Sequence, residues 1–164
     1  KGEIISPNQW FNDVGSFNEG FAKCKINNKG MNWVNEKGEI LIPNQWFDDI
    51  GNFNNGFAIC EISNKYNWIN EKGNLVSPNQ WFNNVGGFKG GFAICKINDK
   101  GRNWINENGE IISPNQWFDD VDNFNDGFAT CRVGHKLYNI DTNGNMIDKE
   151  LSEQIIKMKK MIKY

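Results

Sequence analysis

The chain has 164 residues, a formal net charge of −2 and an aromatic content of 13%. This length is enough for one domain with a buried core, and so many aromatic residues with so small a net charge exclude simple disorder. The charge also lacks the basic excess that is typical of nucleic-acid binding. No apolar run is long enough to cross a membrane, and no signal-peptide pattern is present.

The motif PNQWF occurs four times, which indicates tandem repeats. The four copies begin at Pro7, Pro43, Pro78 and Pro114. Their spacings of 36, 35 and 36 residues are typical of proteins that stack one supersecondary unit repeatedly. We therefore predict four repeats over residues 1–147, together with a partial repeat strand at residues 2–6.

Each repeat is expected to contain three to four short antiparallel strands and no helix. In the first copy, residues 32–35 form one strand, and a turn leads into a second strand at residues 39–42. The turn glycines, which are expected to have positive φ, are Gly38, Gly73, Gly109 and Gly144. In the second copy, residues 46–50 form a further short strand, and residues 56–62 alternate as a half-buried strand does.

This alternating strand shows which positions are packed. Its inward positions stay small and apolar in all four copies, whereas its outward positions vary among Lys, Ile, Thr, Glu and Arg. The cysteines occupy one of the inward positions, at Cys24, Cys60, Cys95 and Cys131. We interpret them as buried free thiols, which behave as small hydrophobes, in preference to disulfides or a metal ladder. No pair has a zinc-like C-x-x-C spacing.

Four such repeats can stack as an open, solenoid-like array or close into a four-bladed propeller-like ring. Propellers are often sealed by splitting one blade between the two termini. Here the strand at residues 2–6 is a surplus copy, and the last repeat completes its own hairpin through residues 141–147. This favours an all-β open array, with the ring as the alternative.

Residues 148–164 change in character and predict a C-terminal amphipathic helix. Asp148 suits the N-cap, and lysines enrich the last turns, where the helix dipole favours positive charge. The apolar stripe consists of Leu151, Ile155, Met158 and Ile162. We interpret the segment as a helix that caps the repeat array. The alternatives are a basic helix for an anionic membrane or a partner groove, and a linker toward another domain.

No set of residues predicts an active site, a metal site or a cofactor. The acidic pairs Asp48–Asp49 and Asp119–Asp120 become Asn12–Asp13 and Asn83–Asn84 in the other copies. Exchanging Asp for Asn destroys a general base or a hard-metal ligand but preserves a turn hydrogen bond. His135 is the only histidine, and we expect it in a surface hairpin loop.

These residues resemble the WG-repeat (KWG-repeat) family over residues 1 to about 147. In the second copy the resemblance is carried by Pro43, Phe47, Asp48, Phe53, Gly56, Ala58, Cys60, Trp68, Ile69, Asn70 and Gly73. The family's Trp-Gly pair is replaced by Met31–Asn32 and its equivalents, and we expect Asn to keep a turn with positive φ. The extra residue in PNQWF suggests a PNQWF/NW-IN-type variant. The resemblance implies a bacterial or phage-associated binding or scaffolding module without a common enzymatic activity.

The function we expect is therefore non-catalytic binding or scaffolding, with a protein as the partner. The candidate partner-binding residues are the variable strand positions Ile59, Glu61, Ile94 and Lys96. The exposed end strands of an open array also predict self-association. Four free cysteines and the missing signal-peptide pattern favour the cytoplasm.

The alternative function is binding of a cell-wall, glycan or choline-like ligand by a row of aromatic side chains. The candidate row consists of Trp10, Trp46, Trp81 and Trp117. A second row consists of Trp33, Trp68 and Trp104. Because aromatic rows in repeat proteins more often stack as core, burial is the first expectation for each row. Nucleic acid is not an expected partner, and membrane contact is expected only through the C-terminal basic helix.

Overall fold

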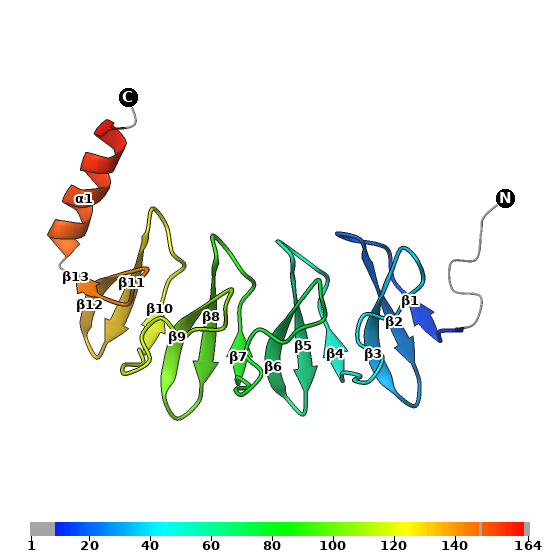
Figure 1. Ribbon diagram of the computed structural model, residues 1–164. Coiled ribbons are helices and arrows are strands. Elements are labelled where there is room, and N and C mark those ends of the chain that lie inside the picture. Colours follow the sequence, from blue (N-terminus) through cyan, green and yellow to red (C-terminus); the bar gives the residue numbers. More distant parts are fainter. Residues whose placement is uncertain (1–8, 148, 163–164) are drawn as a thin grey trace. The chain divides into compact units, whose positions relative to one another are not determined.

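The computed structural model describes residues 9–147 and 149–162, which form four antiparallel sheets and one helix (Figure 1). The first sheet contains β1 (Asp13–Val14), β2 (Phe21–Ile26) and β3 (Gly30–Asn35). The second contains β4 (Asp49–Ile50), β5 (Phe57–Ile62) and β6 (Lys65–Asn70). The third contains β7 (Asn84–Val85), β8 (Phe92–Ile97) and β9 (Gly101–Asn106). The fourth contains β10 (Asp120–Val121), β11 (Phe128–Val133), β12 (Lys136–Asp141) and β13 (Met146–Ile147), and α1 (Lys149–Ile162) follows it.

The repeats are grouped in pairs. The first two sheets belong to one compact unit, Lys1–Asn83, and the last two belong to a second unit, Asn84–Tyr164. Every sheet contains only strands that follow one another in the chain, so none of the sheets that the structure describes shares strands from both chain ends. The prediction of an open all-β array is confirmed, and a ring sealed by a shared blade is not formed. The surplus strand predicted at residues 2–6 lies outside the described residues.

Two of the predicted strands are shorter than expected. The strand at residues 39–42 is reduced to a single bridge between Ile40 and Val34, and only the last repeat extends it into a two-residue strand. Of the strand predicted at residues 46–50, only β4 is formed. Phe47 instead forms an isolated bridge with Met31 of the preceding sheet. The nitrogen of each of these two residues donates to the carbonyl oxygen of the other, at 3.0 and 2.8 Å. This exchange joins the two repeats of the first unit.

A fully buried asparagine holds the PNQ turn against the strand that precedes it. The side-chain nitrogen of Asn67 donates to the carbonyl oxygens of Ser77 (2.7 Å) and Gln80 (3.1 Å). Its side-chain oxygen accepts from the backbone nitrogens of Trp68 (2.8 Å) and Ser77 (3.2 Å). Both donors and both acceptor sites of the amide are therefore used, as a buried polar group requires.

The equivalent residues Asn32 and Asn103 make the same four contacts with the strand and the PNQ turn at their own positions. All three asparagines lie inside strands, and none has positive φ. The expectation that they replace glycine in a turn is therefore wrong, because their side chains, not their backbone conformation, are what the position requires. By contrast, the predicted positive φ is confirmed at the turn glycines, for example 79° at Gly38 and 85° at Gly144.

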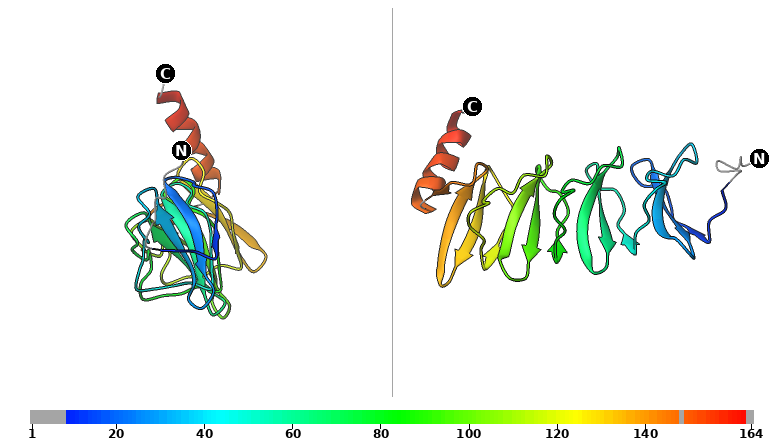
Figure 2. Two further views of the ribbon diagram at one scale, coloured as in Figure 1. Left: turned by 90° about the vertical axis from the view of Figure 1, so that its right-hand side faces the viewer. Right: turned by 60° about the horizontal axis from the view of Figure 1, so that its bottom comes forward.

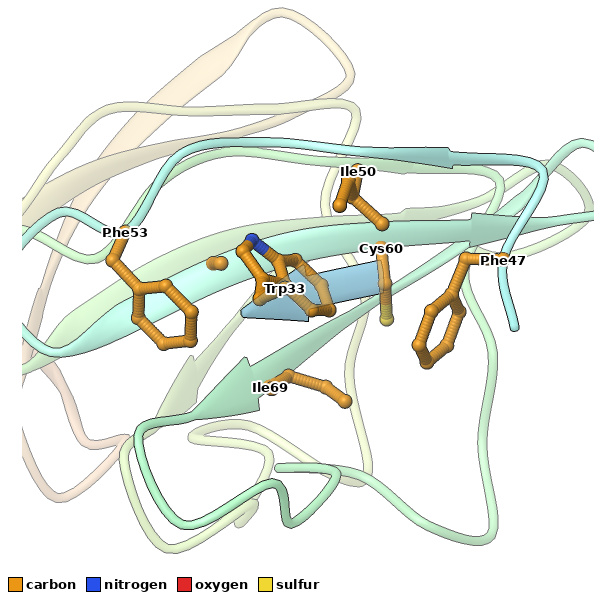
Figure 3. Packing of buried hydrophobic residues seen from close by; sticks show 7 residues of the cluster. Trp33, Phe47, Ile50, Phe53, Cys60 and Ile69 are labelled. Carbon is orange, nitrogen blue, oxygen red and sulfur yellow. The ribbon is translucent and has the colours of Figure 1, made fainter. Parts of the chain in front are cut away.

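The core of each unit is centred on a tryptophan that reaches from one repeat into the next. The Trp33 ring lies 5.7 Å from the Phe47 ring and 5.5 Å from the Phe53 ring, measured between centroids (Figure 3). Its indole nitrogen donates to the carbonyl oxygen of Gly51 at 2.9 Å. Trp104 repeats this arrangement in the second unit. Trp33, Trp68 and Trp104 are all buried, as expected for a core row.

The length of the hairpin connection explains the alternating repeat spacing. Three residues join β2 to β3 before the Ile26–Gly30 pair closes the hairpin, whereas only Ser63 and Asn64 join β5 to β6. Both of these residues have positive φ, 52° and 59°, as a type I′ turn requires. The third hairpin is again long and the fourth is short. One extra residue in the first and third hairpins therefore produces the spacings of 36, 35 and 36.

The helix α1 contacts the fourth sheet through a small polar residue. Ser152 is fully buried, and its hydroxyl accepts a hydrogen bond from the Asn139 side chain on β12. Of the predicted apolar stripe, Leu151 and Met158 are exposed, and in both views of Figure 2 most of α1 extends beyond the strands. The helix therefore contacts β12 at Ser152, and Ile155 of the stripe, one helical turn further on, is half-buried. The predicted N-cap and the side chain of the last stripe residue lie outside the described residues.

Gly30 offers a test of how the long hairpin joins the two repeats of the first unit. A Cβ at this position would lie 2.5 Å from the carbonyl oxygen of Phe47, and φ is 111°. We expect Gly30→Ala to lower the free energy of unfolding by about 2–4 kcal/mol, because strain and a backbone clash add. Gly56→Ala is the control: its φ is 78°, but nothing lies within 4 Å of the added Cβ, so a loss of about 1 kcal/mol is expected. Equal losses in urea unfolding would contradict this account.

Candidate functional site

A groove of about 230 Å³ lies on the second sheet, where two of the predicted partner-binding residues meet. It is lined by Asp49, Ile50, Gly51, Ile59, Glu61 and Tyr66. The strand register places the side chains in a row, since Glu61 of β5 lies opposite Asp49 of β4 on one side and opposite Tyr66 of β6 on the other. Asp49 is exposed, whereas Glu61, Tyr66 and Ile59 are half-buried.

The groove is electrostatically negative. The charge of Glu61 is the main reason why the pKa of Tyr66 is raised; desolvation, a hydrogen bond to Glu61 and the charge of Asp49 act in the same direction. Within residues 9–147 and 149–162, neither carboxylate forms an ion pair with a basic side chain of the chain. Two carboxylates beside an isoleucine and a phenol ring therefore offer both charge and apolar contact to a ligand.

The other two predicted residues lie in the second unit, on β8. Ile94 packs against the core cluster around Trp104 and Phe118 in the second unit, so it contributes to the interior of that unit. Lys96 is half-buried, in register with Asn84 on β7. The structure thus brings Ile59 and Glu61 together in one unit and gives Ile94 a packing contact in the other.

Sequence reasoning missed Asp49 and Tyr66 as members of this site. Asp49 was considered only as half of an acidic pair, and Tyr66 only as a replacement in the family motif. One signal was available, because Tyr66 is the only aromatic residue among the four equivalent positions, the others being Met31, Arg102 and Leu137. The cross-strand register that places it beside Glu61 could not be read from that signal alone.

The predicted aromatic row is not a row of equivalent exposed rings. Its members are Trp10, Trp46, Trp81 and Trp117; the first is 78% exposed and the other three are half-buried. The Lys29 ammonium lies 5.7 Å from the centroid of Trp46, and Lys100 lies 5.7 Å from that of Trp117. Trp81 packs against the core cluster of the first unit. Two ring faces are thus already occupied by cations of the chain itself.

The first members of the acidic pairs, Asp48 and Asp119, prove to be turn-forming residues, as the exchange with asparagine indicated. The first member of each pair accepts a hydrogen bond from the backbone of a hairpin turn. Asp48 accepts from the nitrogen of Ser63 at 2.7 Å, and Asn12 accepts from that of Asn27 at 2.8 Å. Among the described residues, no three His, Cys, Asp or Glu side chains are arranged to hold a metal ion. His135 is exposed in the fourth hairpin turn, as expected.

The four cysteines are buried and unpaired, which confirms their interpretation as core thiols. Burial raises the pKa of Cys60 and Cys95 to about 12, and that of Cys24 and Cys131 to about 11. Because the thiolate is the nucleophilic form, these residues are inert at neutral pH. They stabilise the interior and supply no reactive group.

This burial predicts a loss of stability at alkaline pH. The pKa of a thiol is near 9 in the unfolded chain and about 12 for folded Cys60, so the unfolded state ionises first as the pH rises. The stabilisation by this group is complete below pH ~9 and is lost progressively toward pH ~12. Cys60 should thus contribute about 1.4 kcal/mol less at pH 10 than at pH 8. We would compare wild type with Cys60→Ala by urea unfolding at both pH values. A difference between the two proteins that does not change with pH would contradict thiol burial.

Comparison with known protein families supports the repeat assignment. Residues 1–29 and 33–66 match the family model described as WG containing repeat. These two segments are similar to WG-type repeats, and the match covers the first repeat and most of the second. A search among curated proteins finds no match. No helix in the described part of the chain is long and apolar enough to cross a membrane.

Several solved structures are distantly similar. The computationally designed Ika8 protein has a TM-score of 0.45 and 10% identity, over 82% of this chain and 46% of that protein, so the chain spans less than half of its length. The designed Ika4 protein has a TM-score of 0.44 and 8% identity, over 90% of this chain and 97% of that one. The WD40 β-propeller domain of Doa1 has a TM-score of 0.40 and 14% identity, over 87% and 55%. Similarities at this level do not bear on function.

Proposed function

We propose that this chain is a non-catalytic binding or scaffolding module that recognises a protein partner through the groove of its second repeat. The observation that supports this is the contrast between two sets of positions. Packing positions such as Ala58 and Cys60 keep one residue type in all four repeats, whereas the groove positions Ile59, Glu61 and Tyr66 change. A groove at the equivalent positions of the fourth repeat is lined by other side chains, among them Thr130, Arg132 and Leu137. A repeated scaffold whose groove carries different side chains in different copies is suited to specific recognition.

The size of the groove favours a protein side chain as the occupant. Pockets for small molecules and cofactors usually enclose about 300–1,000 Å³, and this groove, at about 230 Å³, is smaller. An apolar floor with a charged rim is typical of a pocket that receives one anchoring residue of a partner. The neighbouring exposed residues would then contact the rest of the partner surface.

Glycan or choline-like binding is the second candidate, and the exposure of Trp10 favours it. A sugar ring or a quaternary ammonium needs an open aromatic face. Trp10 offers one, but its equivalents Trp46 and Trp117 have lysines over their rings, and Trp81 is packed. This uneven row supports the aromatic candidate less well than the groove supports the first.

We also propose that the repeats are a PNQWF/NW-IN-type variant of the WG repeat. The support comes from the buried asparagine that precedes the core tryptophan, as in Asn32–Trp33. Its side chain binds the carbonyl oxygens of Ile42 and Gln45, which flank the PN of the next PNQWF motif. The two halves of the variant motif thus depend on each other. As in other WG-type proteins, the expected role is binding without catalysis.

Photo-crosslinking tests the protein-binding function. We would place p-benzoylphenylalanine at Asn52, an exposed residue next to the lining residue Gly51, and at its equivalent Ser16 in the first repeat as the control. In lysate of the organism that makes the protein, we expect a defined protein adduct from position 52 and none from position 16. The adduct should be competed by excess unlabelled chain but not by the chain with Ile59→Ser and Glu61→Ser. Equal adducts at both positions, or none from position 52, would refute the proposal.

A further inference from the structure

The second repeat differs from the other three in the charge of the residue that lies opposite the first residue of its short first strand. In the other repeats the register pairs are Asp13 with Lys25, Asn84 with Lys96, and Asp120 with Arg132. In the second repeat, Asp49 is paired with Glu61. Like charges directly opposite each other on neighbouring strands are destabilising. Three repeats therefore supply a cation at a position where the second supplies another carboxylate.

The second unit shows how this first-strand carboxylate binds a guanidinium. Arg102 from β9 of the preceding repeat places its Nη1 atom 3.2 Å from Oδ1 of Asp120. The residue equivalent to Arg102 in the first unit is Met31, which has no charge to offer. Asp49 thus lacks both the cation opposite it and the cation from the preceding repeat that its equivalent Asp120 has.

The remaining walls of the groove suit the other parts of an arginine side chain. Its methylene stem can lie along Ile59, and its planar head can stack on the phenol ring of Tyr66 while it donates to the carboxylates. A lysine would form one charged contact without the stacking or the forked geometry. Calcium prefers six to eight oxygen ligands, which two carboxylates and a phenol do not supply.

We propose that the groove of the second repeat binds an arginine side chain of a protein partner, with the guanidinium between Asp49 and Glu61 and the stem against Ile59. The inference rests on the proposed function, because the arginine would be the anchoring residue of that partner. The partner's arginine would supply the positive charge that Lys25, Lys96 and Arg132 provide in the other repeats. Binding should weaken with added salt, because both carboxylates are at least partly exposed.

The test is an NMR titration of the full chain with three tripeptides, acetyl-Gly-X-Gly-amide, in which X is arginine, lysine or citrulline. Citrulline keeps the shape of arginine without the charge. For arginine we expect saturable shifts of the Ile59 methyl and Tyr66 ring signals, with a Kd on the order of 1–10 mM, as one anchoring residue allows. Lysine should bind a few-fold more weakly, and citrulline should cause no saturable shift.

Two variants copy the residues of other repeats and so keep the fold intact. Glu61→Lys creates the Asp–Lys pair of the first repeat, and Asp49→Asn introduces the amide of the third. Glu61→Lys should abolish arginine binding, and Asp49→Asn should weaken it at least about fivefold, in line with loss of a charge-assisted contact. The dispersion of the remaining NMR signals reports that each variant is folded. Unchanged binding by Glu61→Lys, or equal shifts with citrulline, would overturn the proposal.

The same variant separates this inference from the proposed function. If the chain with Glu61→Lys still forms the crosslinked adduct from position 52, the partner binds without an arginine anchor, and only the arginine assignment fails. If arginine peptides bind but position 52 gives no adduct in lysate, the arginine site stands and the protein-binding function fails.

Discussion

A buried asparagine amide is the interaction on which each of the first three repeats depends. Asn67 and its equivalents use both donors and both acceptor sites on backbone groups of their own strand and of the PNQ turn that follows it, in places that exclude water. This fixes the PNQ turn and therefore the phenylalanine two residues after it, Phe47 in the first unit, which pairs with the preceding strand. The fourth repeat has Tyr138 at this position, since no further PNQ turn follows it, and Asn139 meets α1 in place of a core tryptophan. The last repeat thus differs from the others by having neither the buried asparagine nor the core tryptophan.

Because the buried asparagine and the tryptophan core are repeated, the outward strand positions are free to differ. The pairing of repeats is visible in the hairpins: the long first and third hairpins carry Lys29 and Lys100 over Trp46 and Trp117. The short second hairpin instead leads directly into Tyr66 beside Glu61. A binding surface can therefore arise in one repeat without changing the packing of the others, which is the property that the proposed function requires.

Repetition made much of the fold predictable. Positions that stay apolar in four copies identified the cysteine core, and the open array followed from the complete last hairpin. The role of Asn67 was missed because asparagine suits both positive φ and a buried hydrogen-bond network, and the sequence alone does not separate the two.

Two of the residues that line the groove, Ile59 and Glu61, were predicted from the sequence. Asp49 and Tyr66 join it through cross-strand register, which depends on where each hairpin closes. Ile94 was predicted to be exposed but is half-buried against the core cluster of its unit, because its face of the sheet meets the next repeat.

The most direct test of the central claim is the free energy of unfolding of Asn67→Leu. Leucine is similar in volume but leaves two carbonyl oxygens and two backbone N–H groups without their buried partner, and each such group costs about 1–3 kcal/mol. The control is Asn70→Ala, whose side chain accepts from the nitrogens of Lys72 and Asn74 in an exposed turn; it should cost about 1 kcal/mol. We expect Asn67→Leu to lower stability by at least ~3 kcal/mol, well beyond the control. A loss no greater than that of the control would show that the repeats do not depend on the buried asparagine.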